Sequence, residues 1–287
     1  NLRFEIQADA YRAADPELAS EAREFMTRAR SHRAKAVREG GRPIEEEKRF
    51  LGEHPIVWLG RDDELLRVGV IPDLGGRLVS LRCEGEEWFH RGEPQAVDYP
   101  VAGGYEEYCG LRWRSPGWSE PYEWTRSGDS VHLWGEVGDG FRFDRTYALD
   151  EEDGRPVFHI QSTLTGPEDG KGRGLIRIHP VFSVTDWEEA ELSVRREGGS
   201  WVDLTPWRDG DRDGGVESLE GEGLPAGAWA LRRGGRRLVM EFEPGKVWRC
   251  LLGWDPEDET VSPEIYSERA RLRPEDSITV RQAWHFD

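Results

Sequence analysis

From Pro55 to the C-terminus, apolar and polar residues alternate in short runs that are separated by turns rich in Gly, Asp and Pro. Alternation with a period of two is typical of β-strands with one buried face. We expect strands near residues 55–60, 64–71, 77–83, 131–137, 140–149, 156–165, 174–184, 200–204, 228–232, 236–243, 246–254 and 277–286. So many short strands, with almost no helical pattern among them, predict an all-β sandwich or barrel.

The stretch from Leu65 to Phe89 shows this pattern most plainly. It reads as three strands, LLRVGVI, RLVSLRC and EEWF, with the turn PDLGG between the first two. In the second strand one face is expected to carry Val79, Leu81 and Cys83. Gly75-Gly76 allows the positive φ angles of a tight reversal. Taken alone, this stretch predicts an antiparallel hairpin and a following strand.

Residues 1–54 follow a different pattern. Asp15 and Pro16 are suited to the N-cap and the first position of a helix, and apolar residues follow at near-helical spacing as far as Val37. We therefore divide the chain into a helical N-terminal arm or linker over residues 1–54 and a β-sandwich domain over residues 55–287. The single apolar stripe of the arm predicts that it packs on the sandwich or on a missing domain upstream.

Charge narrows the class of ligand. The chain has 57 Asp and Glu against 39 Lys and Arg, a net charge of −18 at pH 7, which argues against nucleic acid or an anionic membrane as partner. No apolar run approaches the roughly 20 residues of a membrane span, so we expect a soluble chain of undetermined compartment. The three cysteines show no metal-ligand spacing, and no metal or cofactor is indicated.

Several expected strands carry polar or aromatic residues on one side and aliphatic residues on the other. Arg177 and His179 alternate with Ile176 and Ile178, and His159 lies on the polar side of the strand at 156–165. A strand that faces solvent gives a similar pattern. Because Lys and Asp are commoner than His and Trp on such a face, we favour a ligand groove.

Motifs in a fixed order resemble the galactose mutarotase-like, or aldose 1-epimerase-like, superfamily. They are L-G-G-R-L-V-S-L at 74–81, I-H-P-V-F at 178–182, S-P-E-I-Y at 262–266 and L-R-P-E-D-S at 272–277. The chain departs from the family at Val181, where tyrosine is usual, and at Glu275, where glycine is usual. The resemblance covers roughly residues 55–287. It implies a large twisted antiparallel β-sandwich, a supersandwich, whose concave face holds a sugar.

The resemblance also implies catalytic roles for His179 and Glu264. Mutarotation removes a proton from the anomeric hydroxyl and donates one to the ring oxygen, then reverses both steps after rotation about C1–C2. By family analogy Glu264 is the base and His179 the acid. Arg177 is a suitable donor to the carboxylate.

Sugar contacts are expected chiefly from the aromatic segment 91–127, because indole rings stack on the C–H faces of sugars. The candidate substrate-binding residues are Arg177, Arg112, Trp113, Trp118, Trp124, Glu106 and His159. Some of these rings would instead close the end of the sandwich. Trp254 and Trp284 are assigned to the core.

Two functions of different classes remain open. The first is an aldose 1-epimerase-like isomerase that acts on a small sugar. The second is a non-catalytic module, carbohydrate-binding or interdomain, of a larger polysaccharide-degrading glycoside hydrolase, with a sugar or oligosaccharide as ligand. A glycoside hydrolase or lyase in its own right is a third alternative. A phosphorylated sugar would call for an arginine cluster, for which Arg112 and Arg114 are sparse candidates.

Overall fold

The computed structural model describes residues 50–51, 54–60, 65–90, 103–111, 115–184, 187, 189–205 and 214–287. Residues 1–49 of the expected helical arm lie outside this set, as do Arg112, Trp113 and Arg114. None of the helical turns in the described part of the chain has the length or apolarity to span a bilayer.

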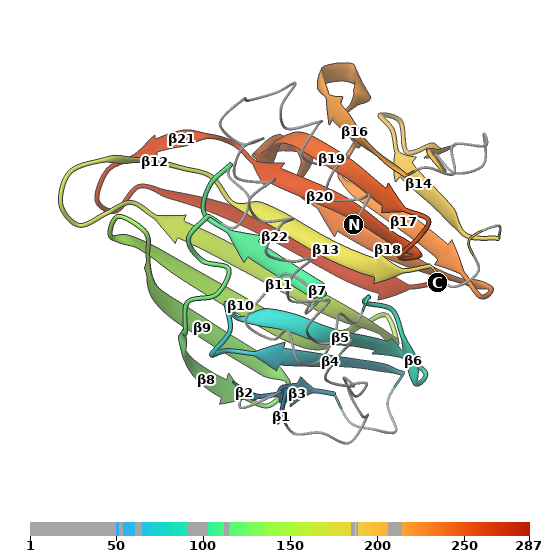
Figure 1. Ribbon diagram of the computed structural model, residues 1–287, viewed down its shortest axis with the longest axis horizontal. Coiled ribbons are helices and arrows are strands. Elements are labelled where there is room, and N and C mark those ends of the chain that lie inside the picture. The colour runs from blue at the N-terminus through green and yellow to red at the C-terminus, as the bar shows by residue number, and fades with distance from the viewer. Residues whose placement is uncertain are drawn as a thin grey trace.

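Within these ranges, two nine-stranded antiparallel sheets pack face to face as a β-sandwich (Figure 1). The all-β architecture expected from the sequence is therefore confirmed. Sheet I has the order β15-β14-β17-β18-β22-β11-β10-β9-β8, and sheet II has the order β16-β19-β20-β13-β7-β5-β4-β3, with β6 paired to β5.

The strands of sheet I are β8 (Glu123–Ser127), β9 (Ser130–Val137), β10 (Phe141–Glu152), β11 (Arg155–Thr165), β14 (Glu191–Arg195), β15 (Trp201–Asp203), β17 (Ala228–Arg233), β18 (Arg236–Phe242) and β22 (Ser277–Phe286). Those of sheet II are β3 (Val57–Leu59), β4 (Leu66–Ile71), β5 (Arg77–Cys83), β6 (Glu86–Glu87), β7 (Gly104–Tyr108), β13 (Arg177–Ser183), β16 (Gly215–Glu220), β19 (Val247–Asp255) and β20 (Thr260–Ser267). Two short pairs join β1 (Phe50–Leu51) to β2 (His54–Pro55) and β12 (Gly172–Gly174) to β21 (Ala270–Leu272). The 3-10 turns are η3 (Gly221–Gly223) and η4 (Pro244–Lys246).

The interior between the sheets is organised around Trp284 of β22. Its ring centroid lies 5.5 Å from that of Tyr105, 5.8 Å from that of Phe182 and 6.1 Å from that of Phe89. These three rings come from sheet II and its following segment, so the contacts of Trp284 hold the two sheets together. The assignment of Trp254 and Trp284 to the core is confirmed, since they are 7% and 1% exposed.

Strands that alternate plainly in the sequence were placed well, whereas two central strands were not recognised. The structure adds β7 within the segment that read as irregular, and it adds β20 around the S-P-E-I-Y motif. Both strands are buried along their whole length and carry polar residues on a buried side. A strand covered on both faces shows no period-two pattern of exposure, which explains why the sequence did not reveal them.

One predicted strand face is corrected in β5. The register between β4 and β5 shifts by one residue at Gly69/Val70, so that Leu78 rather than Val79 faces the interior with Leu81 and Cys83. Val79 packs instead with Ile56, Ile71 and Leu74 in a separate cluster. A β-bulge re-aims the side chains that precede it. With Leu78 directed inward, Arg77 lies on the opposite face of sheet II.

A carboxylate lies inside the sandwich on β7. Glu107 is fully buried and accepts hydrogen bonds from Tyr105 Oη and from Ser162 Oγ, which is 2.7 Å and 2.8 Å from its two oxygens. Arg145 Nε lies 3.7 Å from Glu107 Oε2. Burial raises the pKa of Glu107, opposed by the charge of Arg145 and by the hydrogen bonds. Because side chains alternate along a strand, β7 directs Glu106 to the other face of the sheet.

Glu107 predicts a pH dependence of stability. A carboxyl group whose pKa is raised by folding holds its proton more tightly in the folded chain, so its contribution is fully present below the unfolded pKa of about 4.3 and is lost as the pH rises through the folded pKa. We expect the free energy of unfolding of the wild-type chain to increase relative to that of Glu107→Gln as the pH falls from neutrality toward that value. Urea unfolding across this range measures the difference.

The matched control for this comparison is Glu217→Gln, because Glu217 is an exposed glutamate of β16. The difference in free energy of unfolding between the wild-type chain and Glu217→Gln should not change with pH in the way expected for Glu107→Gln. A wild-type to Glu107→Gln difference that is constant across the range would contradict the account of this buried carboxyl group.

Candidate functional site

Five ionisable side chains form a row across four neighbouring strands of sheet II, here called the polar row. Arg77 of β5 places Nη2 2.7 Å from Oε1 of Glu106 on β7. Arg177 of β13 places Nη2 and Nε 2.7 Å and 2.8 Å from Oε2 of Glu264 on β20. His179 lies between the two carboxylates, with Nδ1 3.9 Å from Glu106 Oε2 and Nε2 3.5 Å from Glu264 Oε1. Successive side chains along the row are therefore Arg77, Glu106, His179, Glu264 and Arg177.

The position of the polar row follows from strand alternation and register. In β13 Ile178 joins the hydrophobic core between the sheets, so its neighbours Arg177 and His179 face the other way. The ladders of β13 place His179 opposite Glu106 of β7 and Arg177 opposite Tyr266 of β20. The row therefore lies on the face of sheet II that is turned away from the core.

All five members of the row are buried, which makes their pairing a physical requirement. Their exposed fractions are Arg77 1%, Glu106 4%, Arg177 0%, His179 3% and Glu264 1%. A buried carboxylate without a counter-charge is strongly unfavourable, and here each carboxylate has its own guanidinium. Two arginines and two glutamates balance, so the imidazole sits among paired charges.

Two tyrosines complete the surroundings of the row. Tyr266 donates its hydroxyl to Glu264 Oε2 at 3.1 Å. The ring centroid of Tyr108 lies 6.3 Å from that of His179, and Arg177 Cζ lies 5.3 Å from the Tyr108 ring and 5.1 Å from the Tyr266 ring. Neither tyrosine was singled out from the sequence, nor was Arg77. Tyr266 follows Glu264 by two residues, the spacing of one strand face, and this was the signal that could have found it.

Three of the other predicted site residues, Trp118, Trp124 and His159, are described and are not members of the polar row. Glu106 and Arg177 join His179 and Glu264 in the row, but Trp118 is half-buried in the segment before β8. Trp124 lies on β8, the edge strand of sheet I, and is 40% exposed. His159 lies on β11 of the same sheet, with Nε2 3.1 Å from Glu152 Oε1. The latter two therefore do not share the face that carries the row.

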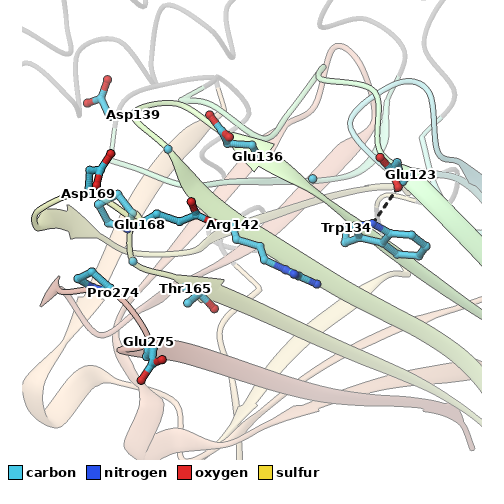
Figure 2. Close-up of a pocket in the computed structure, with 14 residues that line it drawn as sticks. Glu123, Trp134, Glu136, Asp139, Arg142, Thr165, Glu168, Asp169, Pro274 and Glu275 are labelled. Atoms are coloured by element: carbon cyan, nitrogen blue, oxygen red, sulfur yellow. Dashed lines mark hydrogen bonds between the residues drawn. The ribbon is translucent and has the colours of Figure 1, made fainter.

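A cavity of about 900 Å³ lies along sheet I, away from the row (Figure 2). Trp134 Nε1 donates to Glu123 Oε2 at 3.1 Å on one side of it, and Arg142 points across it. Acidic side chains line much of the remainder, namely Glu136, Asp139, Glu168, Asp169 and Glu275. Within the described ranges, no group of three or more His, Cys, Asp or Glu is placed to hold a metal ion.

Comparison with known proteins identifies the fold. No protein-family model matches the sequence, and no curated protein sequence matches it. Among solved structures, a protein from Synechocystis sp. PCC 6803 superposes with a TM-score of 0.62 at 13% identity, over 82% of this chain and 96% of that chain. A candidate aldose 1-epimerase from Escherichia coli K12 gives 0.60 at 13% identity, over 81% and 98% of the two chains. A galactose mutarotase-like protein from Lactobacillus casei ATCC 334 gives 0.58 at 12% identity, over 81% and 100%.

The chain has the galactose mutarotase-like fold. The supersandwich that the sequence motifs implied is thereby confirmed, although no sequence-level comparison finds it. At identities this low the likeness concerns the fold, and what the site does has to be argued from its own residues.

The buried ion pair of the row gives a test by double-mutant cycle. Arg177→Leu leaves Glu264 buried without its guanidinium, and we expect it to lower the free energy of unfolding by about 3–5 kcal/mol. The double variant Arg177→Leu/Glu264→Leu should lose clearly less than the sum of the two single variants, because it removes the uncompensated charge. Urea unfolding measures all three.

An exposed ion pair between an arginine and an aspartate provides the control. Arg155 Nη1 lies 2.8 Å from Asp287 Oδ1, with the two side chains 45% and 42% exposed. Arg155→Leu should change the stability by about 1 kcal/mol or less. Strict additivity in the Arg177/Glu264 cycle, or a loss at Arg177 as small as that at Arg155, would show that the row is not held by charge pairing.

Proposed function

We propose that the chain binds a sugar at the polar row and interconverts its anomers by acid-base catalysis. The observation that supports this most is the position of His179, whose imidazole lies 3.5 Å and 3.9 Å from two carboxylates. A further support is that solved structures with the same fold include a candidate aldose 1-epimerase.

The two oxygens of Glu264 have different surroundings, which suits it to the role of base. Oε2 receives Arg177 Nε, Arg177 Nη2 and the Tyr266 hydroxyl, whereas Oε1 faces His179 Nε2. The donors on Oε2 fix the plane of the carboxylate and balance its charge. Oε1 is then the oxygen that accepts the proton of the anomeric hydroxyl as the C1–O5 bond breaks.

His179 takes the role of acid in the same step. Its protonated imidazole gives a proton to the ring oxygen while Glu264 receives the one from the anomeric hydroxyl, so the number of protons on sugar plus protein does not change. Rotation about C1–C2 presents the other face of the aldehyde, and both transfers reverse. Glu106, held by Arg77, orients the Nδ1 side of the ring and is a positioning residue in this scheme.

Polarimetry on freshly dissolved α-glucose and α-galactose tests this function. The wild-type chain should accelerate equilibration, and His179→Ala and Glu264→Gln should each reduce the enzymatic rate by about 10²- to 10⁴-fold. His159→Ala and Glu217→Gln, at a histidine of sheet I and an exposed glutamate, are the matched controls and should retain the wild-type rate. No acceleration with any common aldose would refute catalysis. Full activity in both site variants would refute catalysis by His179 and Glu264.

A non-catalytic carbohydrate-binding module of a larger polysaccharide-degrading enzyme is the second candidate. The observation that favours it is the complete burial of the Arg177–Glu264 pair, at 0% and 1% exposure, since such a pair can serve the fold alone. Calorimetric binding of a sugar or oligosaccharide without any acceleration of mutarotation would establish this alternative.

A further inference from the structure

The face of sheet I that is turned away from the core carries an indole ring beside the cavity of about 900 Å³. Trp134 of β9 lies on this outer face because its neighbour Leu133 joins the hydrophobic core. Figure 2 shows Trp134 at one end of the cavity and Arg142 extending across it. The half-buried ring is therefore one wall of a hollow on the outer face.

Contacts with two neighbouring side chains hold Trp134 in place. Nε1 donates to Glu123 Oε2 at 3.1 Å. The ring centroid of His132 lies 5.0 Å from that of Trp134, at an interplanar angle of 32°. His132 is itself held, with Nε2 3.6 Å from Asp144 Oδ1. An aromatic ring that is already fixed loses little conformational freedom when a ligand stacks on it.

The strand ladders continue from Trp134 as a line of polar side chains, here called the cross-strand row. Trp134 is opposite Asp144 of β10, Asp144 is opposite Thr163 of β11, and Thr163 is opposite Thr279 of β22. The hydroxyl oxygens of Thr163 and Thr279 are 3.0 Å apart. With strands about 4.8 Å apart, the row extends roughly 14 Å across the sheet.

A second hollow, of about 240 Å³, lies beside the cross-strand row on the same face. Its wall includes Thr146, Gln161 and Arg281, which are consecutive partners in the ladders of β10, β11 and β22. Arg281 Nε donates to Gln161 Oε1 at 3.0 Å. Asp144 and Thr163 separate the two hollows, which are therefore parts of one continuous surface.

The residue types of this surface suit a saccharide. Strands β9, β10, β11 and β22 contain no lysine, and the middle of their outer face carries threonine and glutamine. Short hydroxyls leave room above a sheet and both donate and accept hydrogen bonds, as sugar hydroxyls do. The indole supplies an apolar surface for the C–H face of a sugar ring.

Arg142 adds a polar group of fixed position. Its Nε and Nη2 donate to the two oxygens of Asp144, each at 2.8 Å, and this two-point contact fixes the guanidinium plane. In the described part of the chain Nη1 makes no hydrogen bond, so it can donate to a hydroxyl of the ligand. Carboxylates such as Glu136 and Asp169 accept hydrogen bonds at the edge of the cavity and repel an anionic ligand.

We propose that the outer face of sheet I binds an extended, uncharged oligosaccharide. One sugar ring stacks on Trp134, and the following units lie along the cross-strand row. The length of one unit in an extended glycan is close to the spacing between strands, so successive units meet successive strands. This site is separate from the polar row of sheet II and does not depend on the proposed mutarotase function.

Isothermal titration calorimetry on the full chain tests the proposal with three tetrasaccharides. Cellotetraose is extended and uncharged, maltotetraose is curved, and tetragalacturonate is anionic. We expect cellotetraose to bind, maltotetraose to bind more weakly and tetragalacturonate not to bind. Trp134→Ala should weaken cellotetraose binding by about 10- to 100-fold, and Gln161→Ala by about 2- to 10-fold.

The matched control is Trp124→Ala, at a tryptophan of the neighbouring strand that is 40% exposed. Trp124 is opposite Leu133 in the β8–β9 ladder, so it lies on the other face of sheet I. Its removal should leave the affinity for cellotetraose unchanged. Thermal unfolding shows whether each variant is folded, and Gln161→Ala keeps the test valid if Trp134→Ala is not.

Several results would overturn the proposal. They are no binding of cellotetraose, tighter binding of maltotetraose or tetragalacturonate, wild-type affinity in folded Trp134→Ala, or the same loss in Trp124→Ala as in Trp134→Ala.

The variant His179→Ala distinguishes failure of this inference from failure of the proposed function. It should bind cellotetraose as tightly as the wild-type chain. If His179→Ala loses this binding and Trp134→Ala keeps it, the oligosaccharide occupies the polar row and the sheet I site fails. If binding depends on Trp134 and the wild-type chain accelerates mutarotation of no aldose, the sheet I site stands and the mutarotase function fails.

Discussion

Pairing of buried charge on both faces of one strand is the constraint on which the rest of this structure depends. β7 directs Glu106 to the polar row and Glu107 into the interior of the sandwich, and both side chains are buried. Each needs a cation, which Arg77 supplies on one face and Arg145 on the other. The strand can occupy the middle of sheet II only because two arginines from distant parts of the chain reach it.

The same requirement gives the site its rigidity. His179 lies between two carboxylates, and each carboxylate is held by its own guanidinium. A catalytic or binding group held in this way loses little conformational freedom when a ligand arrives. The burial that makes the row demanding for folding would also strengthen its electrostatic interactions with a sugar.

The sequence predicted much of the fold because most strands are amphipathic. Its period-two alternation placed strands such as β10 and β22, and the motif order around His179 and Glu264 led to the correct fold. The alternation pattern could not show that His179 and Glu264 lie together. β20, which carries Glu264, is buried throughout and has no polar side exposed to solvent.

Other features of the site lie beyond a reading of one strand at a time. Arg77 reaches the row only because a β-bulge turns Leu78 inward, and a single-residue register shift leaves no clear mark in the sequence. Conversely, Trp124 and His159 matched the expected residue types but belong to sheet I, a separation that only the strand order reveals.

A crystal structure of the chain with a bound monosaccharide tests the central claim most directly. The account predicts that the anomeric hydroxyl and the ring oxygen lie within hydrogen-bond distance of Glu264 Oε1 and His179 Nε2, with the Arg177–Glu264 and Arg77–Glu106 pairs intact. A sugar found only on the outer face of sheet I would contradict it. So would a structure at saturating sugar in which no sugar contacts His179 or Glu264.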